Sequence, residues 1–254
     1  MDLRKLFFRV LVTMGFMAAF VVQSIWAEEE KGHARHAPHW AYEGTTGPDH
    51  WGEFFNTCGV GKSQSPIDIK GPFTDIKSAI KISYNKSKLK ILNNGHTIQV
   101  NYDAGSSITI DNKKYDLLQF HFHRPSEERI NGERKAMVAH FVHKSADGKL
   151  AVIGVLLDKG QENLLVKTIW ENLPKEENKE QVKDIEIDAS QLLPKNLAFY
   201  HFTGSLTTPP CTEGVSFYIL KNTMQVSDQQ VSSFPFTNAR PTQPLNGRKI
   251  FESK

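Results

Sequence analysis

The chain has 254 residues, of which 39% are hydrophobic and 23% are charged, and its formal net charge is +3 at pH 7. This length suits one large hydrophobic core, and neither an internal repeat nor a low-complexity tract divides the sequence. A net charge so close to zero gives no basic surface of the kind that binds nucleic acid, so we expect no nucleic-acid partner.

Residues 1–27 have the features of an export signal. Basic residues lie before and at the edge of an apolar stretch that is too short for a regular membrane span. Ala27 would be the last residue before cleavage, although Ile25 is larger than the small residue preferred there, so an uncleaved anchor is the alternative. We predict cleavage, which leaves a single domain over 28–254 that is periplasmic or secreted and no longer attached to a membrane.

The chain has two cysteines, Cys58 and Cys211. An exported chain with two cysteines favours a disulfide bond between them, here across a separation of 153 residues. In the chain-entropy model a loop of this length stabilises the folded state by about 4 to 5 kcal/mol. Two free buried thiols are the alternative, and they would fit a reducing cytosol better.

After a charged, histidine-containing arm over 28–38, the chain consists mainly of short β-rich runs. Turn sequences separate these runs, among them Asn112-Lys113, Asn131-Gly132 and Asp147-Gly148. The one clear helical pattern covers 162–172, where apolar residues recur at helical spacing. The predicted strands are 88–92, 97–102, 107–110, 115–123, 136–143, 150–157 and 215–220. This pattern predicts an antiparallel sheet with little helix.

Two of these strands bring three histidines together. In an extended chain alternate residues share a face, so His121 and His123 point the same way. Asn-Gly is a strong hairpin signal, and if Asn131-Gly132 is the centre of the turn, His123 lies opposite His140. For the His-x-His pair alone, an accidental surface or core position is the alternative interpretation.

Such a set of three imidazoles is suited to a catalytic metal. Three neutral histidines without a fourth protein ligand leave one position of a tetrahedral zinc ion free for water, whereas structural zinc sites are closed. We therefore predict a zinc (Zn2+) enzyme with His121, His123 and His140 as the ligands.

Further motifs are spaced along nearly the whole mature chain, from about residue 39 to 248. They are Tyr42, Gly47-Pro-Asp-His-Trp51, Gln64-Ser-Pro-Ile-Asp68, Asn93-Asn-Gly-His96, Gln119-Phe-His-Phe-His123, Ser126-Glu127, His140, Gly204-Ser-Leu-Thr-Thr-Pro-Pro210 and Asn238-Ala-Arg-Pro241. With these motifs the chain resembles the α-class carbonic anhydrases of the exported bacterial type.

The resemblance implies a fold and an activity. The fold is mainly β: a single domain with a large, mostly antiparallel, twisted central sheet of about ten strands and a few short peripheral helices. The activity is that of a lyase, carbonate dehydratase, in which zinc-bound hydroxide reversibly hydrates carbon dioxide to bicarbonate and a proton. The resemblance also implies inhibition by sulfonamides and small anions, and it allows a homodimer, for which the sequence identifies no contact surface.

The resemblance also assigns roles to single residues. Thr207 and Glu127 orient the attacking oxygen, and His96 is the proton shuttle, since an imidazole titrates near neutral pH. The recess for carbon dioxide is assigned to Val142, Val152, Leu206, Thr208 and Val215. The polar residues around the ligands and the connecting water are Gln119, Tyr42, Asn94, Gln99 and Asn238.

Three positions depart from the family pattern. Glu128 replaces a histidine after the Ser-Glu pair, Val138 replaces a glutamate two residues before the third ligand, and Phe202 replaces a tyrosine. Because metal-bound histidines usually donate their second N–H to an acceptor, we hypothesise that Glu128 supplies to His140 the carboxylate that Val138 does not.

Two other functions use the same residues. A catalytically weak or silent binding protein on this fold would be expected to lack a zinc ligand, and none of the three is missing. A dedicated zinc esterase would need an oxyanion pocket, which the sequence does not reveal. Carbon dioxide hydration is therefore the leading hypothesis.

Overall fold

The structure, a computed structural model, describes residues 39–254. The predicted export signal over 1–27 and the arm over 28–38 lie outside the described residues. Within 39–254 no helix has both the length and the apolar character that crossing a membrane requires.

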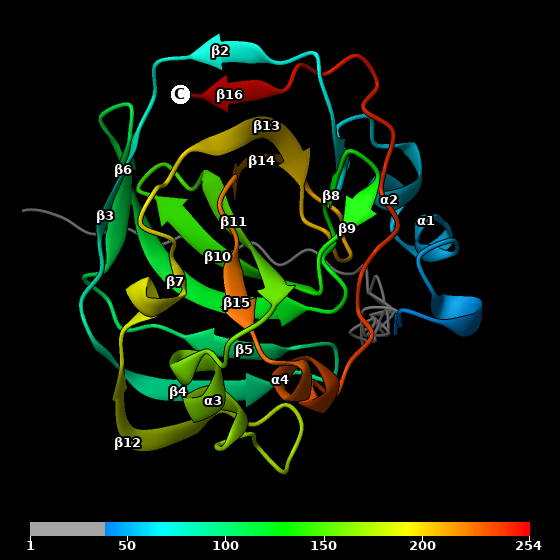
Figure 1. Cartoon of the computed structure of the whole chain (residues 1–254). Helices are drawn as coiled ribbons and strands as arrows, with labels where there is room; N and C mark the ends of the chain where they lie inside the picture. Colours follow the sequence, from blue (N-terminus) through cyan, green and yellow to red (C-terminus); the bar gives the residue numbers. More distant parts are fainter. Residues whose placement is uncertain (1–38) are drawn as a thin grey trace, which may run out of the picture. The chain divides into compact units, whose positions relative to one another are not determined.

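A mixed sheet of 13 strands forms the body of the described domain, and ten of them follow one another in a continuous path (Figure 1). Three pairs, β11–β14, β11–β15 and β16–β2, are parallel, and the other pairs are antiparallel. In path order the ten strands are β12 (Gln181–Ile187), β4 (Ser87–Asn93), β5 (Ile98–Asn101), β7 (Lys113–His123), β10 (Met137–Ser145), β11 (Leu150–Lys159), β14 (Glu213–Leu220), β13 (Phe199–Ser205), β16 (Phe251–Ser253) and β2 (Thr74–Ile76); the others are β3 (Ile80–Ser83), β6 (Ser107–Ile110) and β15 (Met224–Val226).

Smaller elements surround this sheet. A second sheet of three short strands contains β1 (Asp68–Ile69), β8 (Arg129–Ile130) and β9 (Glu133–Arg134). The helical elements are the 3₁₀ segments η1 (Gly44–Thr46) and η2 (Ala189–Leu192) and the helices α1 (Trp51–Phe54), α2 (Asn56–Val60), α3 (Leu164–Trp170) and α4 (Asp228–Ser233). The predicted fold class, a mainly β domain with short peripheral helices, is confirmed.

Each of the seven predicted strands corresponds to an observed one, and helix α3 falls inside the predicted helical segment. The helix is shorter than predicted because Asn163 caps it: its side-chain oxygen accepts hydrogen bonds from the backbone N–H groups of Leu165 and Val166. The turn predicted at Asn112-Lys113 is displaced by one residue. Asp111 and Asn112 both have positive φ, as a two-residue hairpin turn requires, and Lys113 already pairs with Ile110.

The predicted pairing of His123 with His140 is wrong by two residues. His140 pairs with His121, and His123 pairs with Val138. The Asn131-Gly132 turn does form, but it closes the small hairpin β8–β9, and the longer connection between β7 and β10 sets its own register. A shift of two positions keeps each side chain on its original face, so the three histidines still converge.

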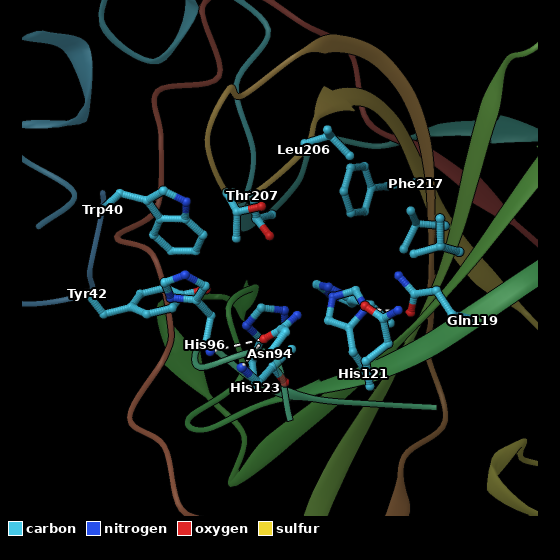
Figure 2. A pocket seen from close by; sticks show the side chains of 16 residues that line it. Trp40, Tyr42, Asn94, His96, Gln119, His121, His123, Leu206, Thr207 and Phe217 are labelled. Atoms are coloured by element: carbon cyan, nitrogen blue, oxygen red, sulfur yellow. Dashed lines mark hydrogen bonds between the residues drawn. The ribbon is translucent and has the colours of Figure 1, made fainter. Parts of the chain in front are cut away.

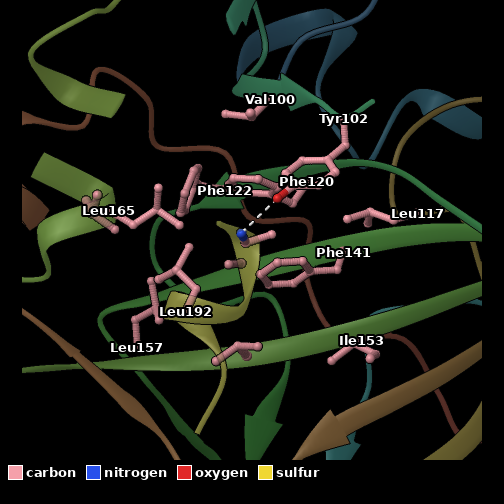
Figure 3. Close-up of a cluster of buried hydrophobic side chains, with 14 of the residues drawn as sticks. Val100, Tyr102, Leu117, Phe120, Phe122, Phe141, Ile153, Leu157, Leu165 and Leu192 are labelled. Atoms are coloured by element: carbon pink, nitrogen blue, oxygen red, sulfur yellow. Dashed lines mark hydrogen bonds between the residues drawn. The ribbon is translucent and has the colours of Figure 1, made fainter. Parts of the chain in front are cut away.

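The central strands bury one face in the hydrophobic core and present polar side chains on the other. On β7, Phe120 and Phe122 are fully buried in the larger core cluster, together with Phe141 of β10 and Leu165 of α3 (Figure 3). The intervening residues Gln119, His121 and His123 face the opposite side. One strand thus anchors itself through alternate aromatic side chains and presents histidines through the others.

Candidate metal centre

Three histidines from β7 and β10 form the only cluster of potential metal ligands found among residues 39–254. One ligand nitrogen of each of His121, His123 and His140 lies within 4.8 Å of the others. His123 and His140 are 1% and 3% exposed, and the ring centroids are separated by 5.0 to 5.6 Å. Figure 2 shows His121 and His123 at the floor of a pocket.

Each of the three imidazoles has a different hydrogen-bond partner. His121 Nδ1 lies 2.9 Å from Oε1 of Gln119, and His123 Nδ1 lies 2.8 Å from the carbonyl oxygen of Asn238. His140 is engaged through its other nitrogen, since Nε2 lies 3.2 Å from Oε2 of Glu128. An acceptor fixes the proton on the nitrogen that it contacts, so Nε2 of His121, Nε2 of His123 and Nδ1 of His140 carry the lone pairs.

Burial keeps two of these histidines neutral. It lowers the pKa of His121 to about 3 and the pKa of His123 well below its usual value, and in both cases neighbouring histidines add to the effect. Burial also acts on His140, but the charges of Glu128 and Glu127 outweigh it and raise its pKa. His123 Nε2 is buried and has no hydrogen-bond partner. A buried lone pair without a partner, in a set of three imidazoles, fits a zinc ion.

Glu127 is a fully buried carboxylate beside the histidines. Its Oε1 accepts a hydrogen bond of 3.0 Å from the backbone N–H of Arg240. Its Oε2 lies 3.3 Å from Nε2 of His123 without a hydrogen bond. Burial raises the pKa of Glu127 to about 7; the charge of Glu128 adds to this shift, whereas His140, the Thr207 hydroxyl and the Arg240 N–H oppose it. Thr207 is thereby placed next to this carboxyl group.

The pocket above the histidines has one apolar and one polar side. Figure 2 shows Leu206 and Phe217 on the opposite side of the pocket from Trp40 and His96. The lining residues are Trp40, Tyr42, Asn94, His96, Thr97, Gln99, Gln119, His121, His123, His140, Val142, Val152, Leu206, Thr207, Thr208 and Phe217. Val215, which we expected in the apolar recess, is buried in the adjoining core cluster and is not among these residues.

His96 is stacked on an aromatic side chain at the polar side. Its ring centroid lies 3.7 Å from that of Trp40, with the two planes 11° apart. Burial lowers the pKa of His96; the charge of His39 lowers it further and that of Glu177 opposes the shift. Asn94 fixes the turn that carries His96, because its Oδ1 accepts hydrogen bonds from the backbone N–H groups of His96 and Thr97.

The remaining polar residues lie at the same side or connect it to the metal centre. Tyr42 lines the pocket, and Gln99 lines it while donating a hydrogen bond to Asn101. The backbone carbonyl of Asn238 accepts a hydrogen bond from His123, and its side chain has a separate role. Its Nδ2 donates hydrogen bonds to the carbonyl oxygens of His96 and Phe122. One side chain therefore ties the turn of His96 to strand β7.

Three residues that line the pocket, Trp40, Thr97 and Phe217, were not predicted from the sequence. Phe217 lies two residues after Val215 on β14, so the alternation along that strand could have indicated it. Trp40 lies outside any strand, so alternation could not have indicated it, and Thr97 directly follows His96. Arg240 lies in the Asn238-Ala-Arg-Pro241 motif, but its role was not predicted, because its backbone N–H donates to Glu127, 113 residues away in the chain.

The predicted disulfide bond between Cys58 and Cys211 is present. It lies directly behind the Thr207 loop, since the backbone N–H of Cys211 donates to the carbonyl of Thr208 over 2.9 Å. Gln64 donates to the carbonyl oxygen of Cys211 and accepts from the guanidinium of Arg240. The loop that carries Thr207 is thus linked covalently to helix α2.

The chain resembles known proteins over nearly all of the described residues. The family model described as eukaryotic-type carbonic anhydrase matches residues 46–254. A carbonic anhydrase of Neisseria gonorrhoeae is 41% identical over 248 residues, which is 94% of this chain and 98% of that protein.

Solved structures agree with this assignment. The α-carbonic anhydrase of Thermovibrio ammonificans, solved in complex with sulfanilamide, is 38% identical with a TM-score of 0.82, over 86% of this chain and 100% of that one. A hyperthermostable carbonic anhydrase from a hydrothermal vent chimney is 44% identical with a TM-score of 0.81, over 85% of this chain and 100% of that one. Together with the three-histidine site, these similarities show that the chain belongs to the eukaryotic-type, or α-class, carbonic anhydrase family.

Proposed function

We propose that this protein is a zinc-dependent carbonic anhydrase that reversibly hydrates carbon dioxide to bicarbonate and a proton. The observation that carries the proposal is the set of three imidazoles, two buried and one half-buried, each with one nitrogen engaged by an acceptor and the other directed to a common centre. Membership of the family supports the same activity.

The ligands of the metal would be Nε2 of His121, Nε2 of His123 and Nδ1 of His140. A zinc ion held by three histidines lowers the pKa of a coordinated water toward neutrality, which makes that water a nucleophile under physiological conditions. The protein's own contribution is to orient the three imidazoles and to keep those of His121 and His123 neutral, as their lowered pKa values indicate.

Thr207 and Glu127 orient the nucleophile. The hydroxyl of Thr207 lines the pocket and lies beside the buried carboxyl of Glu127. If the hydroxyl donates its proton to that carboxylate, its oxygen can only accept a hydrogen bond from the nucleophile. The nucleophile's lone pair then points toward the substrate, which is catalysis by positioning.

Carbon dioxide is apolar and needs an apolar recess rather than a hydrogen-bonding pocket. Val142, Val152 and Leu206 line the pocket beside the histidines, and Phe217 completes this side. Thr208 lines the same pocket. Bicarbonate, which is charged, is held less well by such a surface, and this favours its release.

His96 takes up the proton that each hydration produces. It lines the same pocket as the zinc ligands, and its lowered pKa keeps the imidazole neutral and able to accept a proton at neutral pH. Tyr42, Asn94 and Gln99 line the space between and can order a connecting water chain. We expect sulfonamides to inhibit this enzyme, because a family relative was solved in complex with sulfanilamide. We expect small anions to inhibit it as well.

The enzyme would act outside the cytosol, in the periplasm or as a secreted protein. The bond between Cys58 and Cys211 supports this location, because disulfides persist in oxidising compartments, and the export features of residues 1–27 support it further. Mass spectrometry of the exported protein tests the proposal: the expected mature chain begins at Glu28, whereas an intact amino terminus would contradict cleavage.

Metal removal tests the proposed activity. Protein stripped of metal by a chelator is expected to lose carbon dioxide hydration, and one equivalent of zinc is expected to restore it, as followed by a pH-indicator assay. A His121→Ala variant serves as the control, since it should bind zinc weakly and recover little activity. Retained activity after complete zinc removal would contradict the proposal.

A further inference from the structure

Glu128 is a buried carboxylate held in place by the loop between β7 and β8. Its side chain is 0% exposed. The Ser126 hydroxyl donates to the carbonyl of Glu128 over 2.8 Å and accepts from the backbone N–H of Lys135 over 2.9 Å. The next residue, Arg129, donates its backbone N–H to Ile67 over 3.2 Å. The backbone on both sides of Glu128 is therefore anchored, and its side chain reaches His140 from a fixed position.

No other carboxylate contacts Nε2 of His140 within 39–254; Oε2 of Glu127 lies 3.8 Å from the opposite nitrogen, Nδ1. Val138 lies two residues before His140 on the same face of β10, and it packs in an apolar cluster with Leu156 and Phe202. None of these side chains can accept a hydrogen bond. Among residues 39–254, Oε2 of Glu128 is the one hydrogen-bond partner of His140 Nε2.

Burial of an ionised carboxylate is costly unless a partner compensates it. Oε1 of Glu128 has no hydrogen-bond partner, so the contact with His140 is the direct compensation that this side chain receives. The carboxylate does not stabilise the apolar cluster around Val138, because that cluster offers it no hydrogen bond. It does control His140, because an acceptor at Nε2 places the proton there and leaves the lone pair on Nδ1.

We propose that Glu128 is the positioning carboxylate of His140 and that it fills, from the loop before β8, the role that a carboxylate at position 138 would fill from within β10. The second part follows from strand geometry: residues two apart on a strand share a face, so a glutamate at 138 would lie within reach of the His140 ring. This inference rests on the zinc site of the proposed function.

Zinc affinity, measured by competition with a chelator of known affinity, tests the proposal without an activity assay. Glu128→Gln is expected to bind zinc about 10 to 100 times more weakly than the wild type. Adding Val138→Glu to this variant is expected to recover much of the loss. Glu133→Gln, the same change at an exposed position of the neighbouring hairpin, is the matched control and should bind zinc as the wild type does.

The outcomes separate this inference from the proposed function. If the wild type binds zinc and hydrates carbon dioxide but Glu128→Gln has unchanged zinc affinity, the positioning role is overturned. A loss that Val138→Glu does not reduce overturns the equivalence of the two positions. Absence of zinc binding in the wild type would instead refute the proposed function.

Thermal melting of the metal-free proteins shows whether the variants fold. Should Glu128→Gln fail to fold, Glu128→Asp gives the same test. The aspartate keeps the negative charge, but its shorter side chain moves the carboxylate away from His140. Weaker zinc binding by a folded Glu128→Asp protein supports the proposal, and unchanged binding overturns it.

Discussion

At the scale of single residues, the site depends on which nitrogen each imidazole leaves free. A side-chain amide, a backbone carbonyl and a carboxylate each engage one nitrogen of a histidine. Two of these acceptors, Gln119 and Glu128, were suggested by the sequence. Asn238 was also predicted near the ligands, but its backbone carbonyl, 115 residues from His123, accepts the hydrogen bond, and a backbone group cannot be identified from residue type.

The stacking of His96 on Trp40 has a measurable consequence. Burial lowers the pKa of His96, and Trp40 contributes to that burial through the stacked contact. In a Trp40→Ala variant we expect the pKa of His96 to rise toward 6.5, the ordinary value of a histidine side chain. NMR titration of the ring protons measures this directly, with Trp40→Phe as a control that retains an aromatic surface. An unchanged pKa in Trp40→Ala would show that Trp40 does not determine the burial of His96.

At the scale of elements, strands β7 and β10 present the histidines because successive side chains point to opposite faces of the sheet. Their aromatic residues pack against α3 and the core, and the opposite faces carry the histidines. His143, near the end of β10, does not belong to the site. It is fully buried, its Nε2 lies 2.7 Å from the hydroxyl of Tyr84, and its Nδ1 lies 3.3 Å from the carbonyl oxygen of Ala151.

Folding stability should depend on pH through His143. Burial lowers its pKa from 6.5 to about 4, so the folded state holds a neutral imidazole where the unfolded chain takes up a proton. The stabilisation is complete above about pH 6.5 and is lost as the pH falls toward 4. A Tyr84→Phe/His143→Phe variant removes both polar partners and is expected to lack this component. Urea unfolding at pH 7 and pH 5 tests this, and equal pH dependence in the two proteins would contradict it.

At the scale of the whole domain, the disulfide bond joins the amino-terminal helices to the active-site loop. Cys58 lies in α2, and Cys211 follows the loop of Thr207. Replacing both cysteines by serine is expected to reduce the free energy of unfolding by about 2 to 5 kcal/mol, because the unfolded chain regains its loop entropy. Urea unfolding of the wild type and the double variant measures the difference. A decrease in the free energy of unfolding well below this range would mean that the hydrogen bonds of Gln64 are sufficient to fix the Thr207 loop without the disulfide bond.

Much of the domain was predictable from the sequence, for reasons that differ between elements. The central strands are runs rich in β-branched and aromatic residues between turn sequences, so they were predicted close to their observed bounds; these strands are β4, β5, β6, β7, β10, β11 and β14. Strands of two to four residues, such as β2 and β16, depend on pairing with distant segments and have no pattern of their own. The register between β7 and β10 was missed for a related reason, since the connection contains a hairpin that pairs elsewhere.

The central claim is that the three-histidine site, with Thr207 beside Glu127, hydrates carbon dioxide. Stopped-flow hydration by wild-type protein and a Thr207→Val variant, each with its zinc content determined, tests it most directly. We expect fast turnover at one zinc per wild-type chain and a rate about 100-fold lower in Thr207→Val at equal zinc content, because the nucleophile is no longer oriented. Absence of turnover in the fully zinc-loaded wild type would contradict the claim and favour a silent binding protein on the same fold.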